Sequence, residues 1–143
     1  MSLSAPRVSV VIPSYNHAGY VIEAIDSVRA QSLVEWELIV IDDGSTDGSP
    51  ALVSAHLGAL RDERIRFYLQ ANAGSHAAIN RGLAMARAPY VAILNSDDRF
   101  APTRLERLLD LAAQHPGDLI AMTAVRLIDA EGAAIEEKDP QFW

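Results

Sequence analysis

No cysteine occurs among the 143 residues of the chain, and this absence excludes a disulfide framework, a thiolate nucleophile and a zinc site built on cysteine. Basic residues are also few: 12 Lys+Arg stand against 19 Asp+Glu, which gives a formal net charge of −7. An acidic chain of this kind lacks the basic surface that binds a phosphate backbone, so no nucleic-acid partner is expected.

Long hydrophobic runs are absent as well. No apolar stretch approaches the ~20 residues that span a bilayer, and the start MSLSAPR lacks the apolar core of a signal peptide. Half of the residues are hydrophobic and 22% are charged, a balance that is typical of a packed core. We therefore expect a reduced, soluble, acidic single domain over residues 1–143.

The hydrophobic pattern changes period repeatedly, from short β-branched runs to stripes with helical spacing. The β-branched runs predict strands at residues 8–12, 36–41, 65–69, 90–94 and 119–128. The helical stripes predict helices that begin near Gly19, Ser49, Ser75 and Pro102. This order of elements predicts an α/β fold, with a mainly parallel sheet and helices on both faces. Residues 1–6 and 131–143 are weakly patterned and are expected to be irregular.

Each predicted helix has one apolar face that should be buried. The expected faces are Val21, Ala24, Ile25 and Val28 in the first helix; Val53, Leu57 and Leu60 in the second; Ile79, Leu83 and Ala86 in the third; and Leu105, Leu108, Leu109 and Ala112 in the fourth.

Two acidic pairs follow predicted strands: Asp42-Asp43 after the second and Asp97-Asp98 after the fourth. The carboxyl ends of parallel strands share one edge of the sheet, where ligands bind in open α/β folds. Two acidic pairs at one edge are costly unless a cation or hydrogen-bond donors lie between them. Mg²⁺ or Mn²⁺ carrying a phosphate ligand satisfies this need. Turn formation and helix capping remain the alternative for either pair taken alone.

Other nucleotide-binding and hydrolase motifs are missing. There is no G-x-G-x-x-G after the first strand, no G-x-x-x-x-G-K-[ST] and no G-x-S-x-G in the sequence. Rossmann dinucleotide binding, P-loop chemistry and an α/β-hydrolase nucleophile elbow are therefore excluded.

Three stretches of the chain occur together in a recognisable order: VSVVIPSYNHAGYVIEAIDSVRAQS, WELIVIDDGSTDGS and NAGSHAAINRGLAMARAPYVAILNSDD. The sequence over about residues 7–128 resembles the N-terminal, donor-binding half of the inverting family 2 glycosyltransferases, which have the GT-A fold. The resemblance implies transfer of a sugar from a nucleotide diphosphate sugar, usually UDP-linked, with inversion and with Mn²⁺ or Mg²⁺ as cofactor. The acceptor, a glycan, a lipid or a protein, is not named by the sequence.

The resemblance also implies which residues surround the donor. Pro13 and Tyr15 match the end of the first strand, which lines the nucleotide pocket. Asn72, Gly74 and Asn80 match a segment that borders the donor.

The acidic residues match the family as well. Asp43 corresponds to the carboxylate that hydrogen-bonds the base, usually uracil, and Asp42 has a supporting place. Asp98 would bind the metal directly, and Asp97 would contact the ribose or a metal-bound water. Asn95 stands where the motif has its leading Asp, which removes one negative charge.

Other departures from the family are Ile79, where an Arg is frequent, and Ala88-Pro89, where a Gly is usual. His17 borders the expected pocket, and we interpret it as a loop residue, with contact to a phosphate as the alternative.

The resemblance places the general base in the acceptor-binding half of the family, beyond Trp143, so the catalytic base is unknown here and a truncated, donor-binding portion is predicted. The resemblance also implies a cytoplasmic location, including the inner face of the membrane, with membrane association only through regions outside this chain. The rival function is a nucleotide-sugar-binding module without transferase activity. A nucleotidyltransferase is disfavoured because no Gly-rich loop follows the first strand.

Overall fold

The structure is a computed structural model that describes residues 4–138. The chain divides into two compact units, Met1–Thr103 and Arg104–Trp143. The elements of the first unit are β1 (Val8–Ser14), α1 (Val21–Arg29), β2 (Trp36–Asp42), α2 (Ser49–Leu60), β3 (Ile65–Leu69), α3 (Ser75–Met85) and β4 (Tyr90–Ile93). The second unit contains α4 (Arg104–Gln114), β5 (Val125–Ile128) and β6 (Ala134–Lys138). The single domain expected over residues 1–143 stays a prediction.

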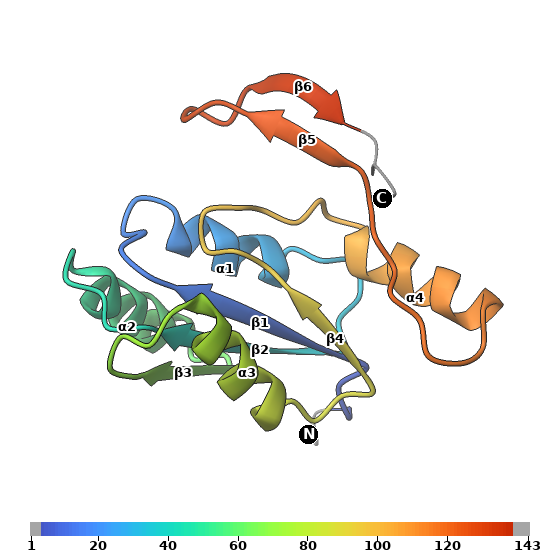
Figure 1. The fold of residues 1–143 in the computed structure, drawn as a ribbon, viewed down its shortest axis with the longest axis horizontal. Helices are drawn as coiled ribbons and strands as arrows, with labels where there is room; N and C mark the ends of the chain where they lie inside the picture. The colour runs from blue at the N-terminus through green and yellow to red at the C-terminus, as the bar shows by residue number, and fades with distance from the viewer. Residues whose placement is uncertain (1–3, 139–143) are drawn as a thin grey trace. The chain divides into compact units, whose positions relative to one another are not determined.

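The first unit is built on a four-stranded parallel sheet with the order β3-β2-β1-β4 (Figure 1). The two central strands, β1 and β2, are buried along their whole length, because their β-branched side chains are covered on both faces. In the register, Ser14 of β1 lies beside Asp42 of β2. The carboxyl ends of the strands, and the polar loops that follow them, therefore meet at one edge.

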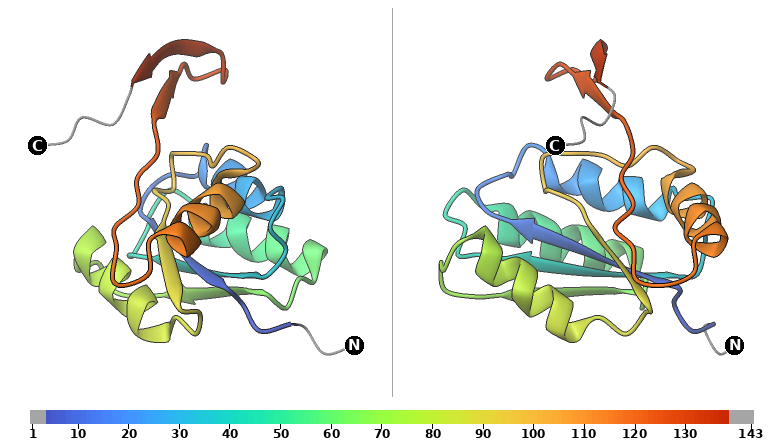
Figure 2. Two further views of the ribbon diagram at one scale, coloured as in Figure 1. Left: turned by 90° about the vertical axis from the view of Figure 1, so that its right-hand side faces the viewer. Right: turned by 45° about the vertical axis from the view of Figure 1, so that its right-hand side comes forward.

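Helices cover both faces of this sheet, as predicted. Helices α1 and α2 lie on one face and α3 lies on the other (Figure 2). The approach of α3 is close, since a Cβ on Gly82 would stand 2.3 Å from Cγ1 of Val11. The mainly parallel α/β architecture expected for a GT-A fold is thereby confirmed.

A buried carboxylate joins the loop between α3 and β4 to the sheet. Glu37 accepts hydrogen bonds from Ser9 Oγ (2.6 Å), Arg66 Nη2 (2.8 Å), and both the backbone N (2.7 Å) and Nε (2.8 Å) of Arg87. Burial raises the pKa of Glu37, but the bonds from Ser9 and Arg87 and the charge of Arg66 outweigh it and hold the pKa below its ordinary value.

The buried faces of the helices agree with the sequence in part. All four predicted residues of α1 are buried, whereas in α2 only Val53 of the predicted face is fully buried. The face predicted for α3 is only partly right: Ile79 and Ala86 are half-buried, but Leu83 is 42% exposed. The fully buried residues of α3 are instead Ala78 and Gly82. The small residues Ala78 and Gly82 let the α3 backbone approach β1 closely. This close packing stabilises the helix more than burial of the larger neighbours Ile79 and Leu83 would. In α4, Leu105, Leu109 and Ala112 are buried, as predicted.

The predicted fifth strand of the parallel sheet is also wrong. Residues 119–124 form no strand, and β5 pairs with β6 in a separate, antiparallel two-stranded sheet. The cause is a tight turn in which Asp129 Oδ1 accepts the backbone N–H groups of Glu131 (3.1 Å) and Ala133 (2.8 Å). Strand β6 corrects the expectation that residues 131–143 are irregular, although 139–143 and 1–3 lie outside the described residues. Residues 4–6 form no helix or strand.

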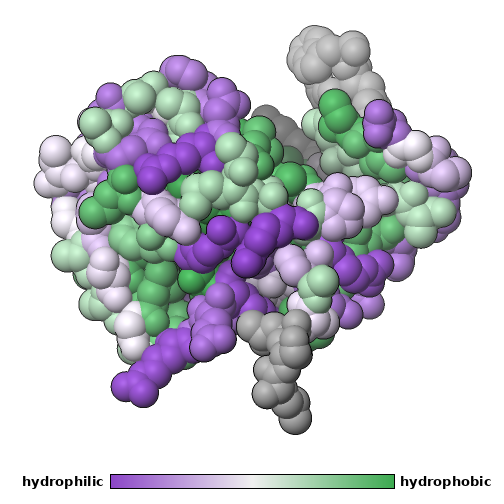
Figure 3. All heavy atoms as spheres, turned by 90° about the horizontal axis from the view of Figure 1, so that it is seen from below, coloured by the Kyte–Doolittle hydropathy of each residue, from purple (hydrophilic) through white to green (hydrophobic). Residues whose placement is uncertain are grey.

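The face shown in Figure 3 is mixed: strongly hydrophilic side chains, in purple, lie between hydrophobic areas, in green. None of the helices between residues 4 and 138 has the length and apolar character to cross a membrane.

Candidate functional site

The loop after β1 is fixed to the loop after β2 at the carboxyl edge of the sheet. Asn16 has a left-handed backbone (φ 52°); its N–H donates to Ser45 Oγ (2.9 Å), and its Oδ1 accepts from the N–H of Thr46 (2.8 Å). Two residues on, Ala18 N–H donates to Asp47 Oδ2 (2.9 Å). Asn tolerates the left-handed region better than most residues, so Asn16 can hold this turn between the two loops.

Asp43 organises the segment that follows β3. Its carboxylate is only 2% exposed; Oδ1 accepts from Gln70 Nε2 (2.7 Å) and Ala73 N (2.9 Å), and Oδ2 accepts from Gly74 N (2.8 Å). Its backbone oxygen accepts from Asn72 Nδ2 (3.0 Å). The structure thus brings the predicted residues Asp43, Asn72 and Gly74 into direct contact.

This arrangement keeps Asp43 ionised. Burial raises the pKa of Asp43, but the hydrogen bonds from Gln70 and from the backbone of Ala73 and Gly74, with a further contribution from His76, hold it below its ordinary value of 3.8. A close approach supports the same loop, since a Cβ on Gly44 (φ 77°) would stand 2.9 Å from Asn72 N. Asp43 is therefore a fixed negative group at the start of the segment expected to border the donor.

Asp42 is the last residue of β2 and is buried. Its Oδ1 accepts from Ser45 N (2.8 Å) and closes the turn after β2, while Oδ2 is buried and has no hydrogen-bond partner among the described residues. This geometry agrees with the supporting place that the sequence indicated for Asp42.

The second acidic pair lies in an exposed turn. Asp97 has a side chain that is 51% exposed, and Asp98 is exposed as well. Asp98 N–H donates to Asn95 O (3.1 Å), and Asn95 Nδ2 donates to Asp98 Oδ2 (3.3 Å). The amide of Asn95 therefore stabilises the Asp98 carboxylate, where a carboxylate in that position would repel it.

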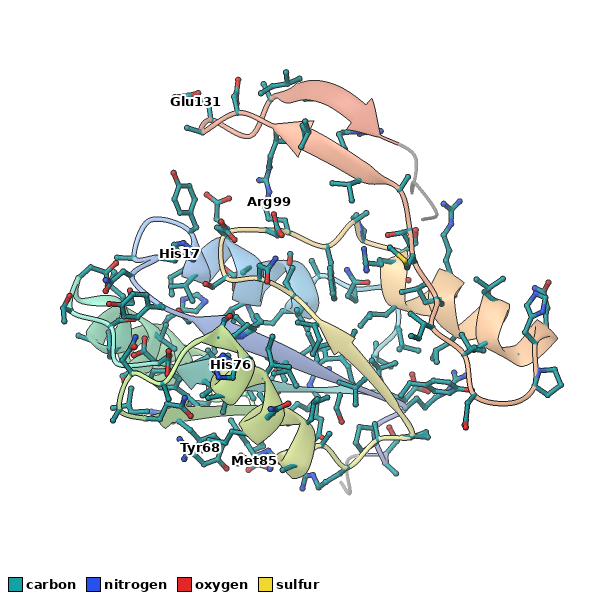
Figure 4. All side chains as sticks on the ribbon, viewed as in Figure 1. His17, Tyr68, His76, Met85, Arg99 and Glu131 are labelled. Carbon is teal, nitrogen blue, oxygen red and sulfur yellow. The ribbon has the colours of Figure 1, made fainter. Side chains whose placement is uncertain are left out.

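His17 joins the loop after β1 to this acidic turn (Figure 4). Its Nδ1 lies 2.7 Å from Ser96 Oγ, and its Nε2 lies 3.9 Å from Asp97 Oδ2. The interpretation of His17 as a simple loop residue is therefore incomplete. Its place directly after the first strand is the signal that could have found it, whereas nothing in the sequence marks Gln70 or Ser96 as partners.

The remaining predicted residues have looser places. Pro13 is buried within β1, and Tyr15 is exposed just beyond the strand. Asn80 is exposed in the middle of α3. Their contacts with a donor stay predictions.

A metal would need oxygens from a ligand to complete its coordination at this edge. Within residues 4–138, no three His, Asp or Glu side chains are grouped closely enough to hold a metal ion. Mg²⁺ typically binds to one or two carboxylates together with substrate phosphates and water. The exposed carboxylates of Asp97 and Asp98 fit such a cation when it arrives with a phosphate group.

Known proteins resemble this chain over most of its length. The chain is 37% identical over 131 residues to the succinoglycan biosynthesis protein ExoO of Rhizobium meliloti, covering 91% of this chain and 36% of ExoO. It is 33% identical over 130 residues to a chondroitin synthase of Escherichia coli, covering 91% of this chain and 19% of the synthase. The chain spans about half or less of the length of such curated relatives.

Among solved structures, the mannosyltransferase PcManGT of Pyrobaculum calidifontis, in complex with GDP-Man and Mn²⁺, matches with a TM-score of 0.70 and 28% identity. The match covers 76% of this chain and 33% of PcManGT. The model of glycosyl transferase family 2 matches residues 9–138, which include both acidic pairs and all of the parallel sheet except Val8. The chain belongs to glycosyl transferase family 2.

Proposed function

We propose that this chain is the donor-binding part of a glycosyltransferase that takes a sugar from a nucleotide diphosphate sugar, with UDP as the nucleotide. The observation that carries the proposal is the pair of exposed carboxylates, Asp97 and Asp98, held at the same sheet edge as the buried Asp43. Among the described side chains, no Arg or Lys forms an ion pair with either exposed carboxylate. A cation that carries a diphosphate supplies the missing positive charge.

The nucleoside is proposed to bind near Asp43 and residues 72–74. Asp43 fixes Gln70 and the backbone of Ala73 and Gly74, so this wall of the site is formed before a ligand arrives. A preformed wall lowers the entropy cost of binding. Tyr15, exposed just beyond β1, is proposed to contact the base with its aromatic ring.

The metal, Mn²⁺ or Mg²⁺, is proposed to bind at Asp98, with Asp97 at the ribose or at a metal-bound water. A bound divalent cation supplies Lewis-acid stabilisation of the diphosphate leaving group. Asn95 orients the Asp98 carboxylate through its 3.3 Å hydrogen bond. The complex of PcManGT with GDP-Man and Mn²⁺ supports a metal-assisted site of this kind.

Transfer with inversion requires a general base for the acceptor hydroxyl. We propose that this base lies outside residues 1–143, in a region that corresponds to the additional length of the relatives. The similarity to ExoO and to a chondroitin synthase supports a role in polysaccharide biosynthesis. A location at the cytoplasmic side of the membrane is part of the same proposal.

A second candidate is a nucleotide-sugar-binding module without transferase activity. Asn95 favours it, because this residue removes one of the carboxylates of the family motif. Release of UDP from a panel of UDP-sugars, measured on a longer chain with candidate acceptors, separates the two. Asp98-dependent release supports the transferase, and binding without release supports the module.

A thermal-shift panel of UDP, GDP and ADP, each with Mn²⁺ or Mg²⁺, tests the proposal. A ligand at about 100 times its dissociation constant adds about 2.7 kcal/mol to the free energy of unfolding. We expect UDP with metal to give the largest shift. A larger shift from GDP would refute the choice of UDP, and no shift from any nucleotide would refute nucleotide-sugar binding.

A further inference from the structure

The turn that carries Asp97 and Asp98 belongs to a longer segment that runs along α1. Its distal half is attached at several points: Ser27 Oγ accepts from Phe100 N (3.1 Å), Gln31 Nε2 donates to Ala101 O (2.8 Å), and Ser32 N donates to Pro102 O (2.8 Å). Its start is attached to the sheet, where Leu94 N donates to Val11 O (3.0 Å). The two ends of the segment are thus held by α1 and by β1.

Between these ends, the attachment near the aspartates comes from His17. In the described part of the chain, the side-chain bonds that join residues 95–98 to another segment are those of His17 with Ser96 and Asp97. Arg99, one residue beyond, forms an ion pair with Glu23 at 3.3 Å, but both side chains are exposed. An exposed pair of this kind contributes little.

His17 is itself held from three sides. Its carbonyl accepts from Tyr20 N (3.0 Å) and Val21 N (2.9 Å) at the start of α1. Its neighbours Asn16 and Ala18 are bonded to residues 45–47, as described above. The ring of Tyr20 packs edge-on against the imidazole, with 6.2 Å between the ring centroids. These contacts therefore hold the imidazole in a fixed position.

We propose that His17 is a positioning residue for the metal-binding turn, and that it acts through Ser96. The proposal rests on the proposed function, since it assigns the purpose of the turn to metal and diphosphate binding. His17 fixes the turn relative to the nucleoside wall at Asp43, so that both parts of one ligand can be bound together.

The distances favour Ser96 over Asp97 as the partner. Nδ1 lies 2.7 Å from Ser96 Oγ, within hydrogen-bond range, whereas Nε2 lies 3.9 Å from Asp97 Oδ2. Ser96 is 2% exposed, and a buried hydroxyl without a partner is costly. Asp97 is half exposed, so water competes for its carboxylate.

Two substitutions of His17 separate these contacts. Asn places its amide near the position of Nδ1 and can keep the bond to Ser96, whereas Gln reaches toward the position of Nε2. We expect His17→Ala and Ser96→Ala to weaken the binding of UDP with Mn²⁺ about two- to twelvefold, the range for one hydrogen bond. We expect His17→Asn to restore it and His17→Gln not to. The double variant His17→Ala/Ser96→Ala should bind UDP with Mn²⁺ as tightly as either single Ala variant, because both substitutions remove the same hydrogen bond.

The affinity for uridine without metal separates two effects. Misfolding of the site would lower it, whereas loss of the position of the metal-binding turn would leave it unchanged. The affinity for uridine should be the same in all these variants, since uridine lacks the diphosphate. Arg99→Ala is the matched control, because it removes the neighbouring exposed attachment of the same segment; it should bind UDP with Mn²⁺ like the parent. Restoration by Gln but not by Asn, equal binding by His17→Ala and the parent, or loss of uridine affinity in His17→Ala would each overturn the proposal.

Hydrogen exchange tests the anchoring without any ligand. The Asp98 N–H, bonded to Asn95 O, should exchange faster in His17→Ala and Ser96→Ala and at the parental rate in His17→Asn. If exchange follows this pattern but the parent binds no UDP with Mn²⁺, the proposed function fails while the anchoring stands. If exchange is the same in every variant, the positioning role is refuted whatever the nucleotide does.

Discussion

Replacement of Asp43 by Asn should both destabilise the first unit and weaken uridine binding. The side chain keeps its size but loses its charge and one acceptor oxygen. In the native protein the carboxylate accepts from Gln70 Nε2, Ala73 N and Gly74 N at 2.7–2.9 Å. In the variant, Nδ2 faces one of these donors.

The magnitude follows from these three bonds. A hydrogen bond to a charged group contributes about 1.5–3 kcal/mol, against about 0.5–1.5 kcal/mol between neutral groups. Two bonds therefore lose about 1 kcal/mol each. The third donor loses its acceptor, at a cost of about 1–3 kcal/mol when it is buried. Because Ala73 is exposed and water can reach this loop, we expect a total near the lower end of the resulting sum, about 3 kcal/mol.

Urea denaturation measures this loss, and calorimetric titration with uridine measures binding with and without Mn²⁺. Uridine affinity should fall equally in both conditions, since Asp43 is not at the metal. Asp62→Asn is the matched control, because Asp62 is also a carboxylate with a lowered pKa, bonded to Arg64 near β3. It should lose stability and bind uridine normally. An Asp43→Asn variant with parental stability and parental uridine affinity would refute the reasoning.

Three further predictions concern Asp98, Glu37 and the effect of acid. Asp98→Asn should abolish the metal-dependent part of UDP binding in calorimetry; retention of Mn²⁺-dependent binding would place the metal elsewhere, and Asp110→Asn, on exposed α4 surface, is the control. Glu37→Ala should lower the free energy of unfolding by about 2–4 kcal/mol in urea, below the ~3–5 kcal/mol of a fully buried pair, because Arg87 is 61% exposed and can be solvated; an unchanged midpoint would contradict the network. Acid should destabilise the chain: the pKa values of Glu37 and Asp43 are lowered by folding, so their contribution is full above their ordinary values of 4.5 and 3.8 and is lost as the pH falls through the lower folded values. Urea midpoints that rise between pH 5 and 3 would contradict this sign.

The sheet and its flanking helices could be predicted because their signals are local. Strands β1 and β2 are continuous β-branched runs, and the stripe of α1 from Val21 to Val28 has the helical period. The face of α3 could not be predicted, because it depends on the close approach of Gly82 to Val11, a contact between segments far apart in the sequence. The hairpin of β5 and β6 depends on the turn at Asp129. This turn favours pairing of β5 with β6, whereas the apolar run before it had predicted a strand of the parallel sheet.

The candidate site could likewise be predicted only in part. The acidic pairs could be found because they follow strands, and parallel strands end at one edge. Their partners could not: Gln70 lies 27 residues from Asp43, and Ser96 lies 79 residues from His17. Only the folded chain brings these side chains together, and no spacing rule within one element links them.

Calorimetric titration of the chain with UDP, in the presence and absence of Mn²⁺, tests the central claim most directly. The claim is that the carboxyl edge binds a nucleotide diphosphate through a cation at Asp98 and a nucleoside wall at Asp43. The account predicts that UDP binds more tightly with Mn²⁺, that uridine binds equally well with and without it, and that Asp98→Asn makes UDP behave like uridine. UDP binding of equal strength with and without Mn²⁺ would contradict it.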